Sequence, residues 1–156
     1  MEKQKSGNRF WRFLFLLYCA VMLWLLFGRS SGWVPELPYE TQLLQNANLL
    51  PLFTIRNYLY VLQFSSDEAL RHHCLINLVG NIFLFIPAGW LFPTVWPKLR
   101  NFFRFFAFSL GLIFLVETLQ LFTLLGSFDV DDVILNLFGM SIGHILHAII
   151  CATKKP

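Results

Sequence analysis

The segment "FDVDDVILNLFGMSIG", Phe128 to Gly143, places three aspartates within four positions directly before an apolar run. The run continues to Cys151, so it reaches the roughly 20 residues that a helix needs to cross a bilayer. It carries the polar Asn136 and the glycine pair Gly139 and Gly143, which form a G-x-x-x-G. Such pairs commonly let two helices approach closely. The acidic start of this hydrophobic helix has to be explained from the rest of the chain.

Composition defines the class of protein. The 156-residue chain is 56% hydrophobic and only 13% charged, and it contains 18 phenylalanines. Its mean hydropathy is +0.60, which is too apolar for a soluble domain and indicates an integral membrane protein. The net charge of +3 comes from short clusters, so the sequence gives no basis for a nucleic-acid partner. The three cysteines, at positions 19, 74 and 151, show neither metal-ligand spacing nor a disulfide framework.

Four runs are long enough to cross a bilayer as helices. The sequence therefore predicts an all-α integral membrane protein that forms a single domain over residues 1–156. The first run also resembles a secretory signal peptide, but it is crowded with aromatic residues and lacks an A-x-A site, so we expect a retained anchor. The predicted spans are approximately 10–27, 75–96, 102–125 and 130–151.

Basic residues predict the orientation of the spans. They precede the first span, separate the second from the third and follow the fourth, which places all three groups on one side. By the positive-inside rule this side is cytoplasmic, so we expect a multi-pass cell-membrane protein with both termini inside. The loop from about Gly28 to Cys74 then lies outside, and its segment from Asn46 to Leu62 is expected to lie in the interface or re-enter it shallowly. The basic residues are Lys3, Lys5, Arg9, Arg12, Lys98, Arg100, Arg104, Lys154 and Lys155.

Polar residues recur at a similar depth near the outer ends of three spans. Their spacing of three or four residues puts the members of each span on one helix face. A carboxylate in hydrocarbon costs a few kcal/mol, so Glu117 is expected to face the bundle with partners, among them Arg56 or Arg71 from the long loop. The residues of this predicted ligand-binding site are Asn77, Asn81, Glu117, Gln120, Asp129, Asp132 and Asn136, together with the two arginines.

The aspartates alone have a structural interpretation. Asp129 can cap the fourth span, and Asp132 can act as the third-position acid of a capping box. Acids in the first turn also complement the helix dipole. Capping does not explain why Glu117 and the amides of the other spans converge on the same level, and we interpret that convergence as a functional site.

Four blocks of the sequence resemble the VanZ-like family, in the order of that family and over residues 46–143. They are "NLLPLFTI", "NLVGNIFLFIPAG", "ETLQ" and "FDVDDVILNLFGMSIG". The resemblance implies a protein that accompanies glycopeptide resistance in Gram-positive bacteria and lowers sensitivity to teicoplanin. Members typically carry an arginine before the acidic stretch, where Gly126 and Ser127 stand here. The resemblance highlights the polar residues of the predicted site other than the two arginines, and it adds Asn48 to that ligand-binding site. It also highlights Pro51, Pro87, Gly89 and Gly139.

Three classes of function fit these features. The first is a membrane-resident resistance or cell-envelope factor that binds an amphiphile, either a lipoglycopeptide or a lipid-linked cell-wall precursor, and needs no cofactor. The second is an enzyme acting on a lipid headgroup, with Glu117 or Asp132 as general base and a divalent cation held by Asp129, Asp131 and Asp132. The third is a small transporter or an assembly subunit, against which the one-sided polar site argues. We favour the first class, with the enzyme as the alternative, and leave the oligomeric state open.

Overall fold

The computed structural model describes residues 2–28 and 36–153 of the chain. Four long apolar helices dominate it, and each is long enough to cross a membrane, which confirms the predicted number of spans. The second of them begins at Glu68, earlier than predicted, because Asp67 caps it by accepting from the amides of Ala69 and Leu70. The four helices are α1 (Glu2–Phe27), α4 (Glu68–Val95), α5 (Phe102–Thr123) and α6 (Val130–Thr153).

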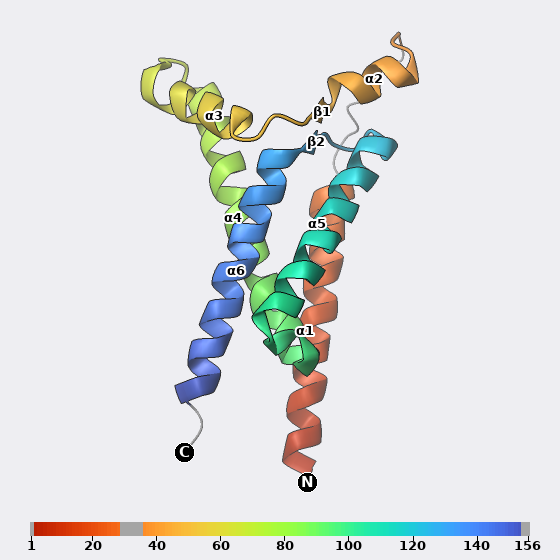
Figure 1. The fold of residues 1–156 in the computed structure, drawn as a ribbon, viewed down its shortest axis with the longest axis vertical. Helices are drawn as coiled ribbons and strands as arrows, with labels where there is room; N and C mark the ends of the chain where they lie inside the picture. Colours follow the sequence, from red (N-terminus) through yellow and green to blue (C-terminus); the bar gives the residue numbers. More distant parts are fainter. Residues whose placement is uncertain (1, 29–35, 154–156) are drawn as a thin grey trace.

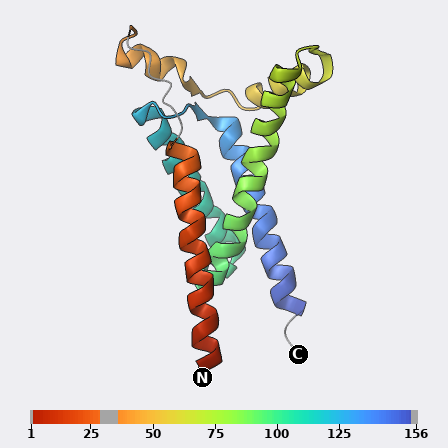
Figure 2. The same cartoon turned by 180° about the vertical axis from the view of Figure 1, so that it is seen from behind.

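Short elements gather mainly at one end of the bundle. Figure 1 shows α2, β1, β2 and α3 together there, and we call this the loop end. Figures 1 and 2 place the start of α1 and the end of α6 toward the opposite end, which we call the terminal end. The α3 helix is only 12 residues long, too short to cross a bilayer, and it runs across the loop end as a side arm. The short elements are α2 (Tyr39–Gln45), β1 (Ala47–Asn48), α3 (Phe53–Phe64), η1 (Pro97–Arg100) and β2 (Phe128–Asp129).

Glycines bring α4 and α6 into backbone contact. A Cβ atom added to Gly143 would overlap the carbonyl oxygen of Ile86, and one added to Gly139 would overlap that of Ile82. On the facing helix, a Cβ on Gly89 would lie 2.9 Å from the Cα of Gly143. The predicted role of the G-x-x-x-G pair in close helix packing is therefore confirmed, and Gly89 of α4 belongs to the same contact.

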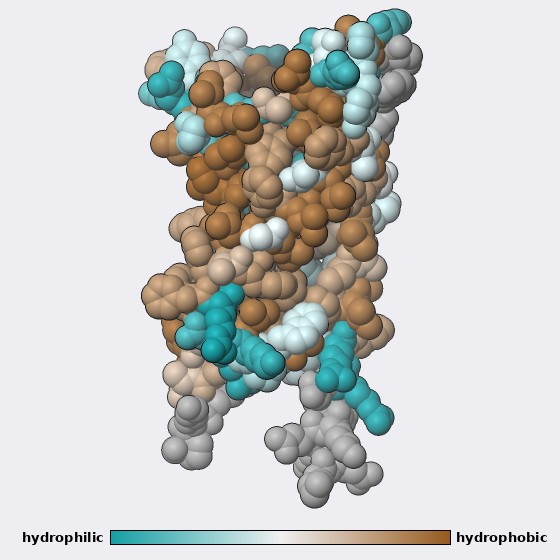
Figure 3. Space-filling model, turned by 45° about the vertical axis from the view of Figure 1, so that its right-hand side comes forward, coloured by the Kyte–Doolittle hydropathy of each residue, from teal (hydrophilic) through white to brown (hydrophobic). Residues whose placement is uncertain are grey.

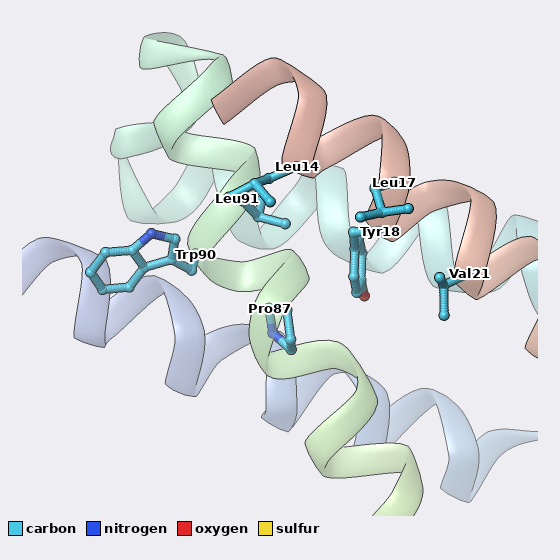
Figure 4. A pocket seen from close by; sticks show the side chains of 7 residues that line it. All are labelled: Leu14, Leu17, Tyr18, Val21, Pro87, Trp90 and Leu91. Atoms are coloured by element: carbon cyan, nitrogen blue, oxygen red, sulfur yellow. The ribbon is translucent and has the colours of Figure 1, made fainter. Parts of the chain in front are cut away.

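The α1 helix leans on α4 near a proline. Pro87 interrupts the hydrogen-bond ladder of α4, and the hydroxyl of Tyr18 donates to the carbonyl of Leu84 at 2.9 Å. Apolar side chains of both helices line a groove of about 390 Å³ beside this contact, which we call the α1–α4 groove (Figure 4). Its lining residues are Leu14, Leu17, Tyr18, Val21, Pro87, Trp90 and Leu91.

The surface is apolar between two more polar ends. Figure 3 shows a broad hydrophobic region over the long helices, with hydrophilic residues near the loop end and the terminal end. Large exposed side chains such as Phe13, Phe103 and Phe114 belong to this apolar surface. This pattern fits helices that face lipid. Lys154 and Lys155 lie outside the described residues, and the cytoplasmic location of the terminal end stays a prediction.

Candidate functional site

The loop end is tied together at Asp129. Strands β1 and β2 pair in parallel, with Asn48 opposite Asp129, and Phe128 N donates to Asn46 O at 2.9 Å. The Oδ2 atom of Asp129 accepts from Thr54 Oγ1 at 2.6 Å and from Asn48 Nδ2 at 3.2 Å. Its Oδ1 atom accepts from the backbone amide of Asp131 at 2.8 Å. Asp129 is therefore the N-cap of α6, as predicted, and it also holds the side arm to that helix.

Asp131 has a role that the sequence did not indicate. Its side chain is fully buried and accepts from Leu52 N at 2.5 Å and from Ile55 N at 3.0 Å. These amides lie at the start of α3, whose N-cap residue Leu52 has a φ of 62° and supplies no side-chain cap. An acid from α6 thus caps a helix that lies far away in the sequence. The carboxylate suits this position because the first amides of a helix need acceptors and carry partial positive charge.

Asp132 faces α4 instead of its own N-terminus. Its Oδ1 atom accepts from Asn81 Nδ2 at 2.5 Å. The capping-box role predicted for Asp132 is therefore wrong, because the backbone N–H of Asp129 faces the Glu117 carboxyl instead. A capping box would require the third-position acid to reach that N–H itself.

Glu117 and Asn136 complete the arrangement between α5 and α6. Glu117 is 3% exposed and Asn136 is 2% exposed, and Asn136 Nδ2 lies 3.4 Å from Glu117 Oε1. The Oδ1 atom of Asn136 is buried without a hydrogen-bond partner. Glu117 and Asp132 are close enough to interact electrostatically. We call Asn81, Glu117, Asp132 and Asn136 the polar cluster, which the structure assembles from three helices.

A comparison with models of known protein families gives a match. The VanZ/LLP1 family matches residues 15–151 of the 156-residue chain. The chain belongs to the VanZ/LLP1 family. This match confirms the resemblance drawn from the four sequence blocks, and it includes the loop end, the glycine contact and the whole polar cluster. Searches of curated proteins and of solved structures found no match.

Two amides predicted for the site of this VanZ/LLP1 protein point elsewhere. Asn77 Nδ2 donates to the backbone oxygen of His73 in its own helix at 2.9 Å. Gln120 Nε2 donates to Leu26 O at 3.0 Å and so joins α5 to the end of α1. Asn77 shares a helix face with Asn81, and Gln120 shares one with Glu117, but neither helps to form the polar cluster.

The two arginines of the predicted site also lie apart from the polar cluster. Arg56 and Arg71 are both exposed. Within residues 9–28 and 36–153, neither forms an ion pair with Glu117. Gly126, one of the two residues that stand where the resemblance implied an arginine, packs near the side chain of Gln120.

The three aspartates of the candidate metal site in this VanZ/LLP1 protein diverge. Asp129 binds the side arm, Asp131 caps α3 and Asp132 faces Asn81. Within the part of the chain that the structure describes, no group of three or more His, Cys, Asp and Glu residues could hold a metal ion. The proposed cation site made of Asp129, Asp131 and Asp132 is therefore not supported, because these side chains serve three different neighbours.

Tyr58 of α3 lies near the polar cluster and was not predicted from the sequence. Its ring meets His73 edge-on with centroids 6.3 Å apart. Burial raises the pKa of the Tyr58 phenol, and the charges of Asp132, Cys74 and Asp129 raise it further. The side arm therefore brings a phenol close enough to Asp132 for their charges to interact. One tyrosine among several aromatic residues of the arm gives no sequence signal for this position.

Proposed function

We propose that this VanZ/LLP1 protein is a resistance-associated membrane factor that lowers sensitivity to teicoplanin by binding an amphiphile at the polar cluster. The amphiphile would be a lipoglycopeptide or a lipid-linked cell-wall precursor, and the loop end would face the outside of the cell. The observation that carries this proposal is the buried acceptor of Asn136, which has no partner although it lies beside the Glu117 carboxyl. Buried polar groups in native proteins are nearly always paired, so an unpaired one at an intramembrane acid supports a binding site.

Glu117→Gln tests this proposal in cells. The amide keeps the shape of the side chain but removes its charge and its exchangeable acid proton. We expect normal membrane abundance and a loss of teicoplanin protection to the level of cells without the protein. Asp132→Asn should impair protection in the same direction. Glu68→Gln is the matched control, because Glu68 is an exposed carboxylate outside the polar cluster, and it should protect like the parent.

Protection by both Glu117→Gln and Asp132→Asn at parental abundance would overturn the proposed role of the polar cluster. The same strains separate the alternative, an enzyme that uses the neighbouring carboxylates Glu117 and Asp132 as acid and base on a lipid headgroup. That function requires a covalently altered lipid or precursor that appears with the parent protein and disappears with Glu117→Gln. Mass spectrometry of extracted lipids measures it directly.

The orientation has its own test. A single cysteine replaces either Ser127 or Lys98 in a chain that lacks the three natural cysteines. The two positions report on which side of the membrane the loop end and the terminal end lie. A membrane-impermeant maleimide added to intact cells should label position 127 and miss position 98, because the positive-inside rule puts the basic loops in the cytoplasm. Labelling of position 98 alone would place the polar cluster near the inner leaflet and exclude an outer-leaflet ligand.

A further inference from the structure

An apolar crevice begins about one helical turn from the polar cluster. It has a volume of about 360 Å³, lies between α1, α4, α5 and α6, and we call it the α5 crevice. Phe85 lines it four residues after Asn81, and Met140 lines it four residues after Asn136. Residues four apart share a helix face and lie about 6 Å apart along the axis. The crevice therefore continues from the polar cluster toward the terminal end, on the same faces of α4 and α6.

The α5 crevice is elongated along the bundle. Its lining extends from Phe85 to Phe92 on α4 and from Phe108 to Val116 on α5. At 1.5 Å rise per residue these stretches are about 10 Å and 12 Å long. Toward the loop end, the hydrogen bond from Gln120 to Leu26 joins α5 to α1 one turn beyond Val116. An elongated apolar space of this kind fits an alkyl chain, and its volume lies within the roughly 300–1,000 Å³ range of small-molecule sites.

The polar cluster indicates which headgroup would accompany the chain. The unpaired atom of Asn136 is its side-chain amide oxygen, which can only accept hydrogen bonds. A group that completes this cluster must therefore donate. Amines and sugar hydroxyls donate, whereas a phosphate would bring further acceptors and negative charge.

We infer that the ligand is an amphiphile whose head donates hydrogen bonds to the polar cluster, as an amine or a sugar does, and whose alkyl chain lies in the α5 crevice. This inference rests on the proposed function for the role of the polar cluster. It adds the chemical class of the head and the place of the chain.

Three probes with the same chain test this inference on the full protein in phosphatidylcholine nanodiscs. They are dodecylamine, dodecyl glucoside and dodecyl phosphate, each with a photoreactive diazirine at the end of the chain. We expect saturable cross-links from the amine and the glucoside to residues of the α5 crevice. Binding of the phosphate should be about tenfold weaker, a loss of about 1.4 kcal/mol, because the phosphate brings acceptors and negative charge instead of donors. Unsaturable labelling of exposed helix faces, or strongest binding by the phosphate, would overturn the inference.

Two substitutions on α1 provide a matched pair. Cys19 lines the α5 crevice, and Val21 lines the α1–α4 groove on the other side of the α1–α4 contact. Cys19→Phe should lower specific cross-linking about tenfold by filling the space, a loss of about 1.4 kcal/mol. Val21→Phe should leave it within about twofold of the parent, less than 0.5 kcal/mol. Equal effects of the two substitutions would contradict a specific chain site, and the probe series on the parent protein decides the question if Cys19→Phe fails to fold.

The outcomes separate this inference from the proposed function. Loss of teicoplanin protection in Glu117→Gln, without specific cross-linking of any probe to the parent, would keep the proposed function and overturn the chain site. Specific cross-linking of the amine and glucoside together with full protection by Glu117→Gln would support the ligand site and overturn its role in resistance.

Discussion

The two halves of α6 contact their neighbours in different ways. Around Gly139 and Gly143 the helix meets α4 through backbone atoms, and no side chain can be added there without overlap. From Asp129 to Asn136 it meets α3, α4 and α5 through carboxylates and amides. One half therefore depends on shape and the other on hydrogen bonds. Substitutions in the first half should change stability, whereas substitutions in the polar cluster should mainly change function.

Gly143→Ala should produce the largest loss of stability. The new methyl group would overlap the carbonyl of Ile86, so α4 and α6 must separate, at a cost of about 3 kcal/mol. Gly111→Ala is the control, because a Cβ there meets nothing within 4 Å, and alanine favours the helix by about 1 kcal/mol. Thermal unfolding in detergent compares the two variants. Equal melting temperatures would remove the distinction between the halves of α6.

Asp131→Asn should have an intermediate effect that is confined to the side arm. The amides of Leu52 and Ile55 lose a charged acceptor, and a weakened bond to a buried amide costs about 1–3 kcal/mol. We expect faster hydrogen exchange over residues 52–64 and unchanged exchange in the centre of α6. Asp67→Asn, at the cap of α4, should leave the arm protected. Uniformly faster exchange in all helices of Asp131→Asn would show that the arm and the bundle are one unit.

The smallest effect concerns Tyr58. Burial raises the pKa of this phenol above its ordinary value of 10.0, and the charge of Asp132 is the next largest cause of the increase. Because the pKa of Tyr58 is higher in the folded than in the unfolded protein, its contribution to the free energy of unfolding is full below the ordinary pKa. This contribution is lost as pH rises through the pKa of the folded state. The tyrosinate absorbance removed by Tyr58→Phe should therefore titrate above pH 10, and at lower pH in an Asp132→Asn background. Tyr60→Phe, at an exposed position, controls for the loss of one ring. Titration of Tyr58 at its ordinary pKa would show that α3 does not bring this phenol close to the polar cluster.

Hydropathy and small residues predicted much of the fold. The four spans follow from length and apolar content, and the close contact at Gly139 and Gly143 follows from their spacing. The cap at Asp129 was also predictable, because its partner amide lies two residues away. These features are local, or depend on the lipid that surrounds every membrane helix. They require no knowledge of which helix lies beside which.

The partners of the polar residues were less predictable. Spacing correctly places Asn77 with Asn81 on one face, but it does not give the position along that face where α6 meets α4. Asn77 bonds to His73 in its own helix instead. Asp131 could not be assigned to α3, because its partners lie 76 and 79 residues away and are backbone amides without a side-chain signal.

The parallel pairing of β1 with β2 has a consequence for biosynthesis. The side arm emerges from the ribosome before α4, but Asp129 and Asp131, which hold it, emerge only after α5. The arm must therefore wait through the insertion of two helices with its first amides uncapped, and exposed segments that are not tied down are preferred sites of proteolytic nicking. Completion of α6 would end this vulnerable interval, so a helix made later also decides when an earlier part of the chain is protected.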